Sequence, residues 1–153
     1  MGSGDAPDQG PLEAVRRRRA ELRESMSALE LALAGPAPRG RERWVERVHV
    51  ALVELSADLR EHVDVTEGVD GLYVDIRATT PRLAGAVERL IEEHHQINEL
   101  VADLLTRTDV PGSDDVDQVR DLGTALLGKL VSHRQRGSDL VFEAYEFDVG
   151  GET

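Results

Sequence analysis

The chain has 153 residues and no cysteine, a length that fits one domain able to fold without disulfide bonds or a structural metal. The lack of cysteine excludes thiolate metal ligands and a cysteine nucleophile. A formal charge of −12 and an aromatic content of 3% argue against nucleic-acid binding, because the chain offers neither a general attraction for phosphates nor a platform for stacked bases.

The N-terminal segment Met1–Gly10 is rich in glycine, aspartate and proline and has no apolar core of the kind that signal peptides carry. No apolar run in the chain reaches the ~18 residues of a membrane span. We therefore expect a cytoplasmic protein that does not enter a membrane. We expect a flexible N-terminus over residues 1–10, one bundle domain over residues 11–147 and a flexible acidic tail over residues 148–153.

Four segments repeat apolar residues at helical spacing, and no segment of useful length alternates as a strand would. The first predicted helix, Pro11–Leu33, begins with a proline suited to the first helical position and ends before Gly35–Pro38. Its apolar stripe is interrupted once, by Arg19. The second predicted helix spans Arg41–Glu67 and ends at Gly68.

The third predicted helix begins at Pro81, with Thr80 as its N-cap. The fourth spans Asp114–Tyr145, with Ser113 as its cap. The connection Gly68–Thr79 is long enough to contain a short helical turn, whereas the other two connections are short. Short connections join antiparallel neighbours, so the predicted fold class is all-α, an antiparallel up-down-up-down four-helix bundle.

Three histidines lie on the apolar stripes of three different predicted helices: His62, His94 and His133. Because the stripes of a bundle face one core, we expect the three imidazoles to converge there. Neutral imidazole is a good ligand for zinc and for non-haem iron. The residues four positions after the three histidines, Thr66, Asn98 and Gly137, are not carboxylates, and Glu67, five residues after His62, is the candidate fourth ligand.

The segments that carry these histidines are Glu61–Glu67 (EHVDVTE), Glu93–Ile97 (EHHQI) and Ser132–Arg134 (SHR). In their order and phase they resemble the hemerythrin-like (HHE cation-binding) family of four-helix bundles. The resemblance covers most of the chain, from Leu12 to Tyr145. It implies a hemerythrin-like bundle with non-haem iron in its core and a role in sensing O2, NO or redox state.

The chain departs from the family pattern at three positions. Judged by its place on the apolar stripe of the first helix, Arg19 occupies the position where the resemblance implies a histidine. Thr66 and Gly137 occupy the positions where it implies the carboxylates of a di-iron centre. The remaining donors favour a single iron or zinc ion over a di-iron centre. The predicted site-lining residues around the ligands are Arg19, Thr66, His95, Asn98, Gly137 and Ser138.

Three interpretations stay open. The first is a metal-binding protein that senses O2, NO or redox state, or handles metal. The second is a metal-free bundle with a fossil site, in which Arg19 pairs with Glu67 and the protein acts through a protein partner or as a homodimer. The third is a bundle whose enlarged core pocket holds a small molecule or haem. A phosphate-binding Gly-rich loop, a G-x-S-x-G elbow and an H-E-x-x-H motif are all missing from the sequence, so no enzyme class is predicted.

Overall fold

The computed structural model describes residues 9–37, 41–109 and 115–147, and these residues contain helices and no strand. Of the N-terminus predicted to be flexible over residues 1–10, residues 1–8 lie outside the described residues, whereas Gln9 and Gly10 are helical and begin α1 two residues before the predicted Pro11. The predicted flexible tail, residues 148–153, and the predicted cap Ser113 also lie outside the described residues. None of the helices described is long and apolar enough to cross a membrane. In chain order the elements are α1 (Gln9–Ala34), α2 (Arg41–Glu67), α3 (Leu72–Thr79), the 3-10 turn η2 (Pro81–Leu83), α4 (Ala84–Asp109), α5 (Val116–Val141) and the π-helical turn η3 (Phe142–Phe147).

The four long helices predicted from the apolar periodicity are confirmed, and α3 is the short helical turn expected between the second and the third. The predicted start of the third helix needs correction. Pro81 opens the 3-10 turn η2, and α4 follows from Ala84. Thr80 makes no side-chain capping bond; instead its backbone N–H donates to the carbonyl of Ile76, so this residue closes α3.

The ends of the fourth helix also differ from the prediction. Asp115 is its N-cap, because the carboxylate accepts a hydrogen bond from the backbone N–H of Asp117 at 3.1 Å. At the other end the α-helix stops at Val141, and the chain continues as a π-helical turn through Phe147. The predicted limit at Tyr145 therefore falls inside η3.

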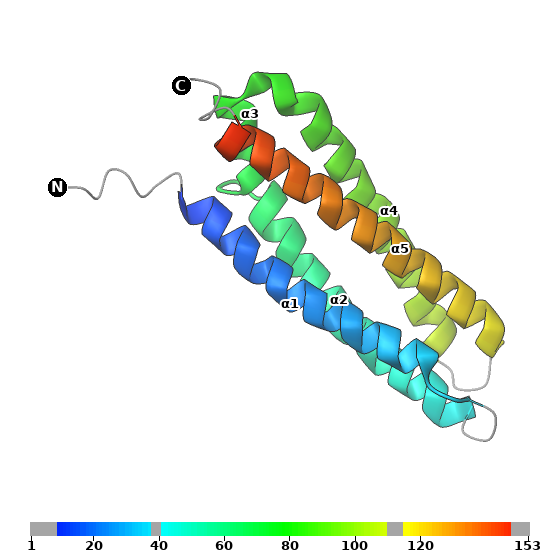
Figure 1. Ribbon diagram of the computed structural model, residues 1–153. Coiled ribbons are helices and arrows are strands. Elements are labelled where there is room, and N and C mark those ends of the chain that lie inside the picture. Colours follow the sequence, from blue (N-terminus) through cyan, green and yellow to red (C-terminus); the bar gives the residue numbers. More distant parts are fainter. Residues whose placement is uncertain (1–8, 38–40, 110–114, 148–153) are drawn as a thin grey trace.

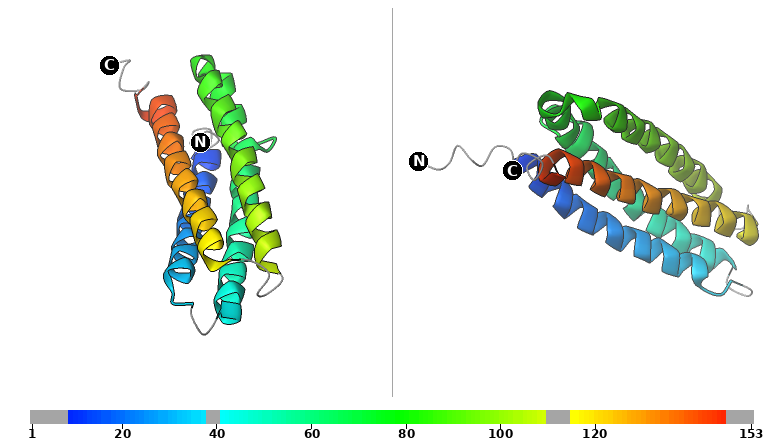
Figure 2. Two further views of the ribbon diagram at one scale, coloured as in Figure 1. Left: turned by 90° about the vertical axis from the view of Figure 1, so that its right-hand side faces the viewer. Right: turned by 45° about the horizontal axis from the view of Figure 1, so that its top comes forward.

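The long helices lie side by side as a bundle, with the start of α1 and the end of α5 at the same end of the molecule (Figure 1). Helix α2 packs against both α1 and α4, and α4 packs in turn against α5. Contacts between α1 and α5 close the ring, as the two further views also show (Figure 2). The short helix α3 covers one end of the bundle, where it contacts α1, α2 and α4.

A layer of polar side chains divides the core into a larger and a smaller apolar cluster. Along α5, Leu130 belongs to the larger cluster, Leu140 to the smaller, and His133 lies between them. His62 and His94 hold the corresponding places in α2 and α4. Burying a polar group costs free energy unless the group is paired, so a layer of three imidazoles at one level needs an explanation beyond packing.

Candidate metal centre

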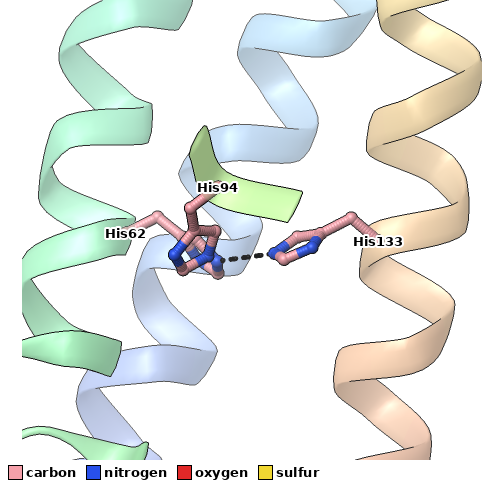
Figure 3. Close-up of side chains that lie close together, drawn as sticks. All are labelled: His62, His94 and His133. Carbon is pink, nitrogen blue, oxygen red and sulfur yellow. Dashed lines mark hydrogen bonds between the residues drawn. The ribbon is translucent and has the colours of Figure 1, made fainter. Parts of the chain in front are cut away.

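The three histidines converge in the bundle core, each from a different helix: His62 from α2, His94 from α4 and His133 from α5 (Figure 3). One potential ligand atom from each lies within 4.8 Å of the other two. The residues are 6%, 2% and 2% exposed, respectively. The predicted convergence is thus confirmed, and three buried nitrogen donors at this spacing could hold one metal ion.

Two glutamates orient two of the rings from outside the cluster. The Nδ1 atom of His94 lies 2.5 Å from Oε2 of Glu67, and that of His133 lies 2.7 Å from Oε1 of Glu93. A carboxylate at Nδ1 keeps the ring proton on that nitrogen and leaves the lone pair on Nε2. Metal-binding histidines usually have such a partner, because it fixes both the tautomer and the ring orientation.

Several ring nitrogens of the cluster are poorly satisfied. Within the described part of the chain, Nε2 of His94 and Nδ1 of His62 are buried and have no hydrogen-bond partner. The Nε2 atoms of His62 and His133 lie 3.4 Å apart, a long contact for a hydrogen bond (dashed in Figure 3). An unpaired buried polar atom costs about 1–3 kcal/mol, and a metal ion bound by these nitrogens would remove part of that cost.

The three rings are held in the neutral form, which is the form that binds metal. Burial, followed by the proximity of the other imidazoles, lowers the pKa of His62 to about 3 and that of His94 to about 3. Burial also lowers the pKa of His133, although the hydrogen bond to Glu93 acts in the opposite direction. At neutral pH no proton therefore needs to leave these rings before a metal ion binds.

Helix α1 supplies a guanidinium to this level of the core. Arg19 is half-buried and donates a hydrogen bond to the hydroxyl of Ser138 on α5. The pair predicted for the fossil site does not form, since Glu67 faces α4 and accepts from His94. Glu67 thus lies at the outer edge of an imidazole, and the three donor atoms that meet in the core do not include its carboxylate.

A cavity of about 20 Å³ borders the cluster. Its lining includes three of the predicted site-lining residues, Arg19, Thr66 and Gly137, together with His62 and His133. This volume is enough for about one water molecule and far below the ~300 Å³ of a typical small-molecule pocket. The prediction of an enlarged core pocket for haem or another organic ligand is therefore wrong at this site.

Two predicted site-lining residues lie elsewhere. His95 and Asn98 are exposed on α4, because the buried stripe of that helix passes through His94 and Ile97, and each of the two is one residue off this stripe. Thr66 is buried, but its hydroxyl donates to the backbone carbonyl of His62 at 2.8 Å, so it offers no free donor to the cluster.

Two residues outside the predicted set shape the site, and the first of them, Glu93, has no role in the sequence-based prediction. Glu93 bridges His133 and Arg136, whose Nε lies 2.5 Å from Oε2 of the carboxylate. Tyr73 of α3 stacks on His94, with ring centroids 5.9 Å apart and planes inclined by 19°. Glu93 directly precedes His94, but only the packing of α4 on α5 shows that it serves the histidine of the other helix.

Comparison with protein-family models, with curated proteins and with solved structures found no match to this chain. The case for a function therefore rests on the geometry of the site. That geometry comprises three buried imidazoles whose ligand atoms lie close together, two orienting carboxylates and two buried ring nitrogens without a hydrogen-bond partner.

Proposed function

We propose that this protein binds one transition-metal ion, iron or zinc, through His62, His94 and His133. The observation that supports this most strongly is that Nε2 of His94 is buried without a hydrogen-bond partner, while carboxylates hold the Nδ1 atoms of His94 and His133. Three protein ligands leave a coordination position open. A metal ion bound by the three histidines would supply a Lewis-acid or redox centre, and a small ligand such as O2 or NO would bind at its open position.

A single ion fits the donor set better than a pair. The three donors are neutral nitrogens, which suit iron and zinc, whereas a di-iron centre also needs bridging carboxylates. The two glutamates nearest the cluster are already engaged by imidazole protons, Glu67 by His94 and Glu93 by His133.

In this proposal the bundle is hemerythrin-like, with its long helices antiparallel in an up-down-up-down order and with Arg19 in place of a first-helix ligand. The protein acts in the cytoplasm as a sensor of O2, NO or redox state, or in metal handling, and is not assigned an enzymatic reaction. A cavity that holds about one water molecule supports a diatomic ligand over an organic one.

Metal binding is tested by elemental analysis of protein purified from iron- and zinc-supplemented cells and after reconstitution with each metal. We expect about one ion per chain, consistent with one open three-histidine site. His94→Ala and His133→Ala should lose the ion. His95→Ala is the matched control and should retain it, because His95 is the exposed neighbour of His94. Wild-type protein that stays metal-free after both treatments would refute the proposal.

A second candidate function is that of a metal-free bundle that acts through a protein partner or as a homodimer. An open apolar groove between α1 and α2 favours it, since its lining includes Leu31 and Val50, which are 75% and 53% exposed. Sizing chromatography with light scattering tests the homodimer. A dimer that Leu31→Glu converts to monomer would support it, and a monomer at every concentration would exclude self-association.

A further inference from the structure

A groove of about 780 Å³ lies between the start of α1, the end of α2 and α3, at the end of the bundle that α3 covers (Figure 1). Small residues make room for it on α1, where Gly10, Pro11 and Ala14 belong to its lining. The lining also includes Val69 and Val74, which are 88% and 44% exposed. The groove therefore presents an apolar surface that the described part of the chain leaves open to solvent.

The same groove is acidic. Its lining includes Asp64, Asp70 and Asp75, and among the described residues that form it there is no lysine, arginine or histidine. Asp64 and Asp70 are exposed, and neither forms an ion pair within the ranges that the structure describes. Asp75 accepts a hydrogen bond from Tyr145, which leaves its negative charge in place. We call this feature the acidic groove.

Two arginines that follow the lining residues along their helices are paired with carboxylates outside the groove. Arg18 of α1 contacts both Glu21 and Glu61. Arg77 of α3 pairs with Glu88 of α4. The charges of these arginines are thus already compensated, and the aspartates of the acidic groove remain available to a cationic partner.

We propose that the acidic groove is a docking site for a basic amphipathic segment of a partner protein, whose apolar side chains cover the valines and whose lysines or arginines pair with the aspartates. Complementary charge selects such a segment and rejects acidic ones. The net charge of −12 attracts it over a longer range. The groove lies on the elements that carry Glu67 and Tyr73, so the partner docks beside the histidine centre, whether or not that centre holds a metal ion.

Two other occupants match the groove less well. A polyamine would neutralise the aspartates but leave the two valines exposed. A second copy of the chain offers one strongly basic segment, Arg16–Arg19, but Arg18 is paired with two glutamates and Arg19 is half-buried and bound to a hydroxyl of α5. Neither supplies free positive charge together with apolar side chains, which is what the lining calls for.

The probes are two fluorescein-labelled synthetic peptides of equal charge, one built of repeated Lys-Leu-Leu-Lys units and the other of Lys-Ser-Ser-Lys units. Fluorescence anisotropy measures their binding to the wild-type protein. The dissociation constant of the leucine peptide should be about tenfold or more below that of the serine peptide, because only the leucine peptide also buries apolar surface. Equal affinity for the two peptides would contradict a docking surface that uses the valines.

Asp64→Asn/Asp70→Asn should raise the dissociation constant of the leucine peptide about tenfold, because two carboxylates that pair with it are lost. Glu92→Gln/Asp121→Asn is the matched control. It removes the same two charges from exposed positions on α4 and α5, and should change the dissociation constant less than about twofold. An equal loss of affinity in the two double variants would show that the peptide responds to the net charge of the protein, and would overturn the groove as its site.

Val69→Ser tests the apolar part of the groove. It should remove most of the preference for the leucine peptide while leaving the affinity for the serine peptide unchanged, because this valine is exposed and its loss affects only the apolar contact. Val131→Ser, changed at an exposed position of α5, is the control and should keep the preference. A preference that survives in Val69→Ser to the same degree as in Val131→Ser would refute the assignment.

Competition and sizing distinguish the peptide from the other two occupants. Spermine should displace the leucine peptide no better than sodium chloride of the same ionic strength, and the peptide-free protein should not associate through this groove. Displacement by spermine at concentrations equimolar with the peptide would identify a small polycation as the occupant. A wild-type dimer in light scattering that Asp64→Asn/Asp70→Asn converts to monomer would identify a second copy. Either result would overturn the proposal, and neither depends on whether the histidines bind metal.

Discussion

At the scale of single residues, the centre depends on how each imidazole is held. His94 is fixed on one side by the carboxylate of Glu67 and along its face by the ring of Tyr73. His133 is fixed by Glu93, which is held in turn by Arg136. The Nε2 atoms are therefore oriented before any ligand arrives, which reduces the entropy that binding would cost.

Glu93→Gln tests this orientation. The amide keeps the shape of the side chain but loses the charge that holds the proton on Nδ1 of His133. We expect metal affinity, measured by competition with a chromophoric chelator, to fall about 10- to 100-fold. Glu92→Gln is the control, because Glu92 is the exposed neighbour and should leave the affinity unchanged. An unchanged affinity in Glu93→Gln would show that the carboxylate does not support the ligand.

The three histidines could be predicted from the sequence because burial follows helical periodicity, and each lies on an apolar stripe. The roles of the glutamates could not. Periodicity places Glu67 on a face of α2, but the hydrogen bond that its carboxylate accepts comes from His94 of α4, 27 positions later in the chain. Such pairings depend on how neighbouring helices rotate against each other, which a single helix does not encode.

At the scale of the helices, close packing of α1 on α5 depends on Gly123. A Cβ atom at this position would lie 2.6 Å from Cδ1 of Leu33, a distance at which the leucine must move. Gly128, also in α5, has open space around the position of a Cβ atom. A change to alanine at each of these two glycines therefore separates the effect of interhelical packing on stability from the effect of helix propensity.

Gly123→Ala should lower the free energy of unfolding by about 1 kcal/mol, because the cost of overpacking exceeds the gain in helix propensity. Gly128→Ala should raise it by up to about 1 kcal/mol, because only the propensity changes. Urea unfolding monitored by circular dichroism measures both. Shifts of the same sign in the two variants would mean that α1 and α5 do not approach as described.

The existence of the helices could be predicted from periodicity, and the bounds of α2 agree with the prediction at both ends. The end of α5 could not be predicted, because the π-helical turn that follows it is tied to another element. Tyr145, in the π-helical turn, donates a hydrogen bond to the carboxylate of Asp75 in α3, 70 residues earlier. Local sequence patterns do not report such a contact.

At the scale of the whole molecule, the bundle keeps uncharged imidazoles between two apolar clusters, which ties its stability to pH. Burial holds the pKa of His62 and of His94 at about 3 in the folded state, against 6.5 as the ordinary value. Between these values the unfolded chain binds more protons than the folded one. The contribution of these two neutral rings to the free energy of unfolding of the metal-free protein is therefore fully present above pH 6.5 and is lost as the pH falls toward 3.

We expect the free energy of unfolding of chelator-treated protein to decrease from pH 7.5 to pH 5 with a slope that approaches about 1.4 kcal/mol per pH unit for each of His62 and His94. His94→Leu should have a shallower slope, and His95→Ala, changed at an exposed position, should keep that of the wild type. Urea titrations at several pH values measure these slopes. A slope that His94→Leu leaves unchanged would contradict the burial of a neutral ring.

The most direct test of the central claim is X-ray absorption spectroscopy on protein reconstituted with zinc. The account predicts about one zinc ion per chain with three imidazole nitrogens at about 2.0–2.1 Å and one further light-atom ligand. His133→Ala should lose one imidazole or the whole ion. Zinc that is absent, or bound without the scattering of three imidazoles, would contradict a metal centre built from His62, His94 and His133.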